Sequence, residues 1–168
     1  MPDPAESADD VWALGAEDEF VPPVPDAVDL VVETATMMSV FAAQRLTRVD
    51  AMRRELLLEA SGRGDGVRDI VERSIRLELA AAMRVTEYAA GRLIVQAQAL
   101  VRRYPAALQA LGSGRITEKH AEILADLLDE APPELRATLL ERALPLAEAE
   151  PVGTFRRALR TLIQTAQA

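Results

Sequence analysis

The chain has 168 residues and a formal net charge of −8; 49% of the residues are hydrophobic, but only 4% are aromatic. This length corresponds to one domain that is large enough to bury a core, and the composition predicts an aliphatic core built from helices. The chain has no cysteine, which excludes disulfides and thiolate metal sites and is typical of a reducing compartment.

The negative charge is concentrated at the N-terminal end of the sequence. Residues 1–33 carry ten acidic residues and no Lys or Arg, whereas residues 45–115 carry 13 basic and 8 acidic residues. Residues 116–150 carry 3 basic and 9 acidic residues. Because the acidic and basic regions are separate, the net charge neither supports nor excludes binding to nucleic acid.

Residues 1–26 are predicted to be a disordered acidic tail, because they contain five prolines and have few side chains to bury. The tail either keeps the protein in solution or folds back over a basic face and competes with nucleic acid. No apolar run approaches the roughly 20 residues that span a bilayer, and the N-terminus lacks the basic residues of a signal peptide. We therefore expect a cytoplasmic protein that does not enter a membrane.

Residues 27–168 are predicted to form a single all-α domain that begins with a helix from 27 to about 60. The apolar stripe of this helix consists of Val31, Ala35, Met38, Ala42, Leu46, Val49, Met52 and Leu56. At 1.5 Å per residue the helix would be roughly 50 Å long, which exceeds the width of a small domain. We expect part of the stripe either to face a second chain in a homodimer or to be covered by the other helices.

The rest of the domain is predicted to consist of shorter helices. The glycine-rich segment 61–66 is predicted to be a loop; it does not fit a phosphate-binding loop, because no strand precedes it and no Lys-Ser/Thr follows. The helices are expected at 67–83, at 87–103, from Pro105 to about 111, from a Thr117 cap to about 130, from Pro132 to Leu146, and from 151 onward with Thr154 as its cap.

Residues 79–93 have the spacing of a helix-turn-helix. The pattern consists of apolar Leu79, Met83, Val85, Ala90 and Leu93, the small Ala80 where the helices would touch, and Thr86 as a helix cap. Such a unit either places its second helix in a groove of DNA or is a plain helical corner. The two interpretations are about equally supported by these residues.

Basic residues around this corner are the candidates for contact with DNA. We expect phosphates to be contacted by Arg84, Arg92, Arg102 and Arg103, with Thr86 and Tyr88 nearest the bases. Glu87 stands among them and would repel phosphate. In the alternative interpretation, the arginines cap helix C-termini and pair with acids such as Glu72 and Glu78.

No catalytic residue, metal site, cofactor or small-molecule substrate is predicted. His120 is the only imidazole, and no nucleophile or second orienting group accompanies it, so a packing role is expected. Glu118 and Glu122 share a helical face with the acids that follow, but a hard cation needs further converging ligands. A solvated acidic face, or a face that docks a basic surface, is favoured.

Three segments in order carry a resemblance to a known family. They are 79–94, the segment Ala110-Leu111-Gly112-Ser113-Gly114-Arg115-Ile116-Thr117-Glu118-Lys119-His120-Ala121, and 135–149 followed by Pro151 and a helix at 155–162. Together they resemble the actinobacterial domain of unknown function 222, over about residues 28–168. That domain commonly precedes a C-terminal HNH endonuclease domain.

The resemblance carries no nuclease residue to this chain. An HNH site needs a His base, a second His or an acid as a metal ligand, and usually an Asn, and this sequence has one His and no Asn. The chain is then either a fragment of a longer nuclease or a stand-alone relative. The favoured function is a non-catalytic accessory domain that helps an HNH-type protein to engage DNA. The alternative is a dimerisation or protein-docking module that uses the 27–60 helix.

Overall fold

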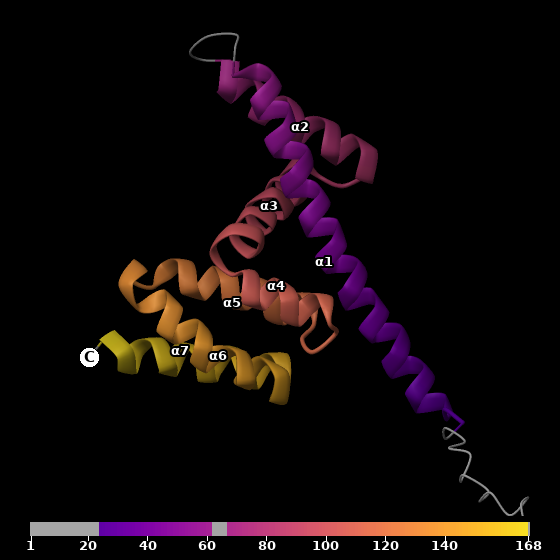
Figure 1. The fold of residues 1–168 in the computed structure, drawn as a ribbon, viewed down its shortest axis with the longest axis vertical. Coiled ribbons are helices and arrows are strands. Elements are labelled where there is room, and N and C mark those ends of the chain that lie inside the picture. Colours follow the sequence, from indigo (N-terminus) through magenta and orange to yellow (C-terminus); the bar gives the residue numbers. More distant parts are fainter. Residues whose placement is uncertain (1–23, 62–66, 168) are drawn as a thin grey trace, which may run out of the picture.

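The computed structural model describes residues 24–61 and 67–167, and all regular secondary structure in this part of the chain is helical. The helices are α1 (Ala27–Ala60), α2 (Val67–Met83), α3 (Glu87–Gln98), η1 (Ala99–Arg103), α4 (Pro105–Gly112), α5 (Glu118–Glu130), η2 (Pro133–Leu135), α6 (Arg136–Ala149) and α7 (Val152–Gln167) (Figure 1). The predicted all-α class and the long first helix are confirmed. Residues 1–23 of the predicted tail and 62–66 of the predicted loop lie outside the described residues.

The helix starts follow from short polar side chains that satisfy the first free backbone N–H groups. Asp26 and Asp29 form a capping box at the start of α1, in which each carboxylate accepts from the other residue's N–H at 2.9 and 3.0 Å. The Thr86 hydroxyl accepts from the N–H of Ala89 at 3.1 Å, and Thr117 caps α5. The sequence predicted both threonine caps.

Two helix ends adopt the Schellman motif, which needs one residue in the left-handed region. At the end of α4, Gly114 takes this position with φ +71°, and the N–H of Arg115 donates to the carbonyl of Ala110 at 2.9 Å. At the end of α2, Arg84 takes it with φ +56°, although an L side chain is strained there. These motifs set the α4–α5 and α2–α3 corners.

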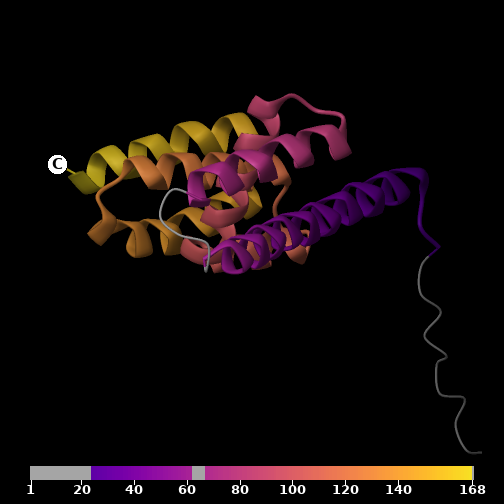
Figure 2. The same cartoon turned by 90° about the horizontal axis from the view of Figure 1, so that it is seen from above.

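The helices form two connected groups. α1 contacts α2, α3 and α4, whereas α5 contacts α6 and α7, and contacts of α5 with α4 and α1 join the two groups. The N-terminal half of α1 reaches beyond the other helices in both views (Figures 1 and 2). Most of the buried residues of α1 therefore lie in its C-terminal half.

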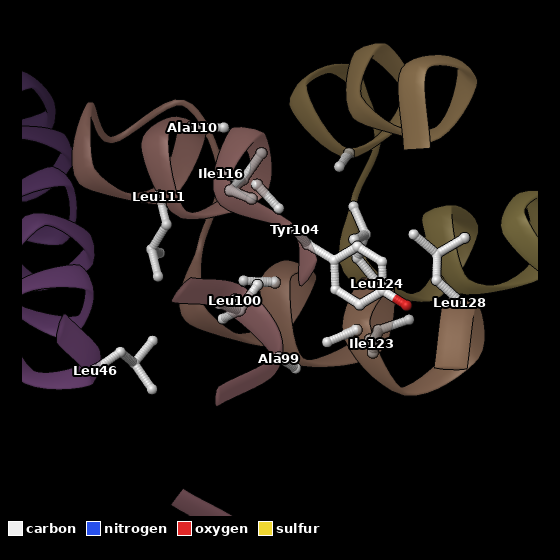
Figure 3. Close-up of a cluster of buried hydrophobic side chains, with 14 of the residues drawn as sticks. Leu46, Ala99, Leu100, Tyr104, Ala110, Leu111, Ile116, Ile123, Leu124 and Leu128 are labelled. Carbon is white, nitrogen blue, oxygen red and sulfur yellow. The ribbon is translucent and has the colours of Figure 1, made fainter. Parts of the chain in front are cut away.

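The core is aliphatic, as the composition predicted, with one buried tyrosine at its centre. Leu46 of α1 lies on one side, and leucines of η1, α4 and α5 surround Tyr104 (Figure 3). Ala121, Leu124 and Leu128 are fully buried on the inner face of α5. Phe155 and Leu159 bury the inner face of α7.

Several local predictions differ from the structure. The predicted 87–103 helix is α-helical only to Gln98, and its last turn is a π-helix that the N–H of Tyr104 closes on the carbonyl of Ala99 at 3.0 Å. Thr154 lies inside α7 and is not its cap, because the helix begins at Val152. Val85 is not a core residue but is 40% exposed at the corner. α6 continues to Ala149, three residues past the predicted end.

Candidate functional site

The α2–α3 corner forms where the sequence predicted it. Its turn presents Arg84, which is exposed and has no ion pair among the described residues. Thr86 is exposed, but its hydroxyl is occupied by the cap of α3. Tyr88 is 79% exposed on the first turn of α3. These three predicted DNA-contacting residues lie together and face solvent.

The other three predicted residues point to carboxylates of neighbouring helices. Arg92 pairs with Asp126 at 2.8 Å and with Glu122 at 3.3 Å, and Arg103 pairs with Asp129 at 2.6 Å. Arg102 donates from Nε to Asp50 at 3.1 Å, and the Asp50 side chain is only 2% exposed. The structure thus separates the six predicted residues into an exposed trio at the turn and three arginines that are ion-paired within the chain, although their side chains are 40–47% exposed.

The acidic face of α5 is the partner of these arginines. Its carboxylates recur every three or four residues, at Glu118, Glu122, Asp126 and Asp129. Glu118 pairs with Arg45 of α1 at 2.5 Å, and the others pair with Arg92 of α3 and Arg103 of η1. The predicted acidic face therefore docks basic residues of the same chain. The ion pairs of α5 join it to α1, α3 and η1.

The strongest electrostatic coupling is at Asp129. The Tyr104 hydroxyl donates to its Oδ1 at 2.6 Å, and Arg103 donates to both carboxylate oxygens. Burial opposes the charge of Asp129, but the hydrogen bonds from Arg103 and Tyr104 outweigh it and lower the pKa of this carboxyl. Burial and the bond to Asp129 raise the pKa of Tyr104 to about 12.

The same physical causes act on the Arg92 pair. The hydrogen bond and the negative charge of Asp126 raise the pKa of Arg92, so this guanidinium stays charged. Burial disfavours the ionised form of Glu122, but hydrogen bonds from Lys119 and Arg92 outweigh burial and lower its pKa. These groups form ion pairs within the fold, and their protonation state does not change near neutral pH. They do not have the features of an acid–base catalyst.

His120 has a structural role. It is buried in the first turn of α5, where its Nδ1 accepts from the N–H of Thr117 at 3.4 Å. Its Nε2 donates to the carbonyl of Glu150 at 2.9 Å, and its ring lies 5.4 Å from that of Phe155. Both ring nitrogens are used, so the imidazole joins α5 to the connection between α6 and α7. In the described residues, no three His, Cys, Asp or Glu side chains could hold a metal ion together.

A groove of about 830 Å³ lies between α2 and α3, next to the corner. Arg73, Arg76 and Tyr88 line it, and the Arg76 Nε is buried without a hydrogen-bond partner in the described part of the chain. Glu87 lies 3.9 Å from that nitrogen. The basic residues that line the groove are nearly balanced by its acidic residues, so its net charge is close to neutral. Glu72 and Arg92 are also paired with other residues of the chain.

The largest exposed apolar surface of the described chain is on α1. Its members are Val28, Leu30, Val31, Val32, Met37, Met38 and Phe41. Val31 and Met38 belong to the predicted apolar stripe and are both 68% exposed, whereas Leu46, further along the same stripe, is fully buried. The rest of the fold therefore covers only the second half of this stripe.

Length and composition would also allow α1 to cross a membrane. Its most apolar window has a mean hydropathy of 1.2 and is 17% buried; a core helix or a signal sequence meets the same criteria. Asp29 and Glu33 interrupt the apolar residues of α1, so the sequence has no uninterrupted apolar run there. No other helix of the described residues meets the criteria.

Sequence reasoning missed the acidic partners of the arginines. Asp50 and Asp129 were not proposed as partners, and Glu72 pairs with Arg53 of α1 and not with an arginine of the corner. Glu78 accepts a hydrogen bond from Ser74. The repeat of carboxylates on α5 was the available signal, because carboxylates at this spacing lie on one face of a helix, where bases of neighbouring helices can meet them.

The comparisons with known proteins give one match. A family model with the description "Domain of unknown function (DUF222)" matches residues 36–167, which is more than half of the chain. The match begins inside α1 and ends with α7. Searches of the curated proteins and of the solved structures found no match.

Proposed function

We propose that this chain, which belongs to the DUF222 family, is a non-catalytic helical assembly domain that joins polypeptides through the uncovered half of α1. The observation that carries the proposal is the run of exposed apolar side chains from Val28 to Phe41. Monomeric proteins rarely expose a large contiguous apolar patch, and such patches mark interaction sites.

The helix itself supports this proposal. A helical segment without tertiary contacts is marginal in water, because most helical stability in proteins comes from packing of an apolar face. The first turns of α1 have a capping box, but the other helices cover little of the segment that follows. A second polypeptide would supply the missing contacts.

The mass of the purified chain in solution tests the proposal. Light scattering between about 5 and 200 µM is expected to give a mass that rises above that of one chain. Phe41→Glu places a charge in the apolar patch and is expected to keep the chain monomeric. Ile70→Glu is the matched control, because Ile70 is an apolar residue of α2 outside the patch on α1 and is 70% exposed. A strict monomer throughout this range would contradict the proposal.

Contact with DNA is a second candidate function, and the exposed trio at the α2–α3 corner favours it. Arg84 and Tyr88 are accessible there, and Arg73 lines the adjacent groove without an ion pair among the described residues. Phosphate contacts of this kind give salt-sensitive binding with little sequence preference.

Binding of a duplex at two salt concentrations tests this second candidate. Arg84→Gly removes a charge and also relieves the left-handed backbone at φ +56°, so weaker binding would not come from unfolding. The variant is expected to lower the salt slope by about one, whereas Arg142→Ala on α6 is expected to leave it unchanged. Absence of salt-sensitive binding at tens of micromolar would contradict the candidate.

A further inference from the structure

We propose that the polypeptide on the uncovered face of α1 is a second copy of this chain, with the two α1 helices antiparallel. The inference rests on the proposed assembly function and adds to it the identity of the partner, the direction of the helix pair and its register. Two features of the chain support the inference: the distribution of charge along α1 and the groove beside its C-terminal half.

The charges of α1 are separated along its length. From Ala27 to Gln44 the helix carries two acids and no base, and from Arg45 to Arg54 it carries four arginines. The one acid of the second segment, Asp50, is buried and paired with Arg102, and Arg45 and Arg53 are paired with Glu118 and Glu72. Glu55 and Glu59 follow on α1, outside the proposed contact. An antiparallel pair places the acidic segment of each copy on the basic segment of the other. A parallel pair would place like charges together, which is unfavourable.

The charges also select a register. If the two-fold axis passes at the level of Ser39, Glu33 lies opposite Arg45 of the second copy, and Asp29 lies one residue from the position opposite Arg48. Both interactions occur twice because a two-fold interface is self-complementary. Arg48 is exposed and has no ion pair among the described residues, so it is available for this contact.

The centre of this register is apolar. Met37 and Phe41 lie on the outward face of α1, away from the buried Leu46, and both are exposed. In the antiparallel register, Met37 of one copy lies opposite Phe41 of the other. The apolar centre is then flanked on both sides by opposite charges, which is the arrangement of a desolvated interface core with a polar rim.

A groove of about 450 Å³ runs between α1 and the end of α2, beside the same face. Phe41, Arg48, Met52 and Met83 are among its lining residues. The register brings Leu30 of the second copy opposite Arg48, at this groove. Leu30 is exposed in the single chain and would gain an apolar site there. The contact would run from about residue 26 to 52, a length of about 40 Å.

Disulfide trapping tests the direction of the pair, and the absence of cysteine from the sequence makes single replacements specific. Met37→Cys lies near the two-fold axis and is expected to form a disulfide between copies. Gln44→Cys lies on the same face, but in the antiparallel register its two copies are about 15 Å apart along the axis, beyond disulfide reach. A parallel pair would bring both positions together with their own copies.

Charge reversal tests the register. Glu33→Arg and Arg45→Glu are each expected to weaken the dimer at least about tenfold, because each places like charges in contact. The double variant is expected to return the dissociation constant to within about threefold of the original. Glu33 makes no side-chain hydrogen bond or ion pair among the described residues. The pair of Arg45 and Glu118 is exposed on both sides and contributes little to stability, so neither replacement should change the helix content of the monomer.

The outcomes separate this inference from the assembly function. A dimer that Gln44→Cys traps as well as Met37→Cys, or whose charge reversals do not compensate, would overturn the antiparallel pair and leave the assembly function in place. A strict monomer would overturn both. Trapping by Met37→Cys alone, together with recovery in the double variant, is the expected result.

Discussion

The contacts of individual arginines determine how much unpaired basic surface this protein has. Eighteen arginines suggest a binding surface when they are counted, but Arg92, Arg102 and Arg103 each point to a carboxylate of the same chain. A guanidinium that is hydrogen-bonded in this way must give up a charged partner before it can contact phosphate. Arginine content alone therefore overstates the case for DNA.

The pair of Arg102 and Asp50 leads to the first prediction. Arg102→Ala would leave the Asp50 carboxylate buried without its cation, which is expected to cost about 2–4 kcal/mol of unfolding free energy. Asp50→Asn in the same background removes the buried charge and should recover part of that loss. Urea denaturation of the original chain, the single variant and the double variant measures both effects. Equal stability of the single variant and the original chain would contradict the prediction.

Tyr104 leads to a prediction about alkaline pH. Its pKa is raised from 10.0 to about 12 by burial and by the bond to Asp129. The folded state therefore holds the phenol proton more tightly than the unfolded state does, and this stabilisation is complete below pH 10. It is lost as the pH rises toward 12, and two pH units correspond to about 3 kcal/mol.

Thermal unfolding followed between pH 8 and 12 checks the alkaline prediction. Tyr104→Phe keeps the ring in the core but has no titrating hydroxyl, so its curve should be flatter over this range. It should also be less stable at neutral pH, because the partly buried Asp129 loses one donor. Parallel curves for the two proteins would show that another group controls the alkaline loss.

At the scale of helices and turns, the corners place the elements. The α4–α5 corner contacts α1 through Gly114, where an added Cβ would lie 2.3 Å from Cγ2 of Thr36. Gly114→Ala is expected to cost about 2–3 kcal/mol, because the side chain is strained at φ +71° and also meets Thr36. The turn is thus both a chain reversal and a close contact with α1.

The two contributions can be measured separately. Thr36→Ser keeps the hydrogen bond to the carbonyl of Val32 but lacks Cγ2, so in this background Gly114→Ala should cost only about 1 kcal/mol. Gly153→Ala is the matched control, because no atom lies within 4 Å of the added Cβ in α7. It is expected to stabilise the chain by about 0.5–1 kcal/mol. An equal effect at the two glycines would contradict the argument.

The same scale shows how far the sequence could predict this fold. Helix starts were predictable because Thr86 and Thr117 satisfy backbone donors within their own turns. The π-helix at 99–103 was not, since it depends on burying Tyr104 beside Asp129, which lies 25 residues further along the chain. Arg84 shows a related limit, because its left-handed turn is required by the corner and not favoured by the residue.

For the whole molecule, the family and the all-α architecture were both predictable, and the family match at 36–167 confirms the resemblance. The placement of the candidate site was less predictable, because ion pairs between distant helices leave no local pattern around the arginines. The association with an HNH endonuclease stays a prediction. The length of α1 correctly indicated that the other helices could not cover all of it, since the fold covers only the half that contains Leu46.

The uneven covering of α1 leads to a last prediction about amide exchange along one continuous helix. Amides near Leu46 lie in the core and are expected to exchange only on global unfolding, whereas those from Val31 to Met38 are protected only by whatever packs on the projecting half. If chains associate through that half, dilution should speed exchange there and leave the Leu46 segment unchanged. Phe41→Glu should make exchange of the projecting half fast at every concentration. Uniform, concentration-independent protection along α1 would mean that this half of the helix is stable alone, and the exposed apolar residues would then need a different explanation.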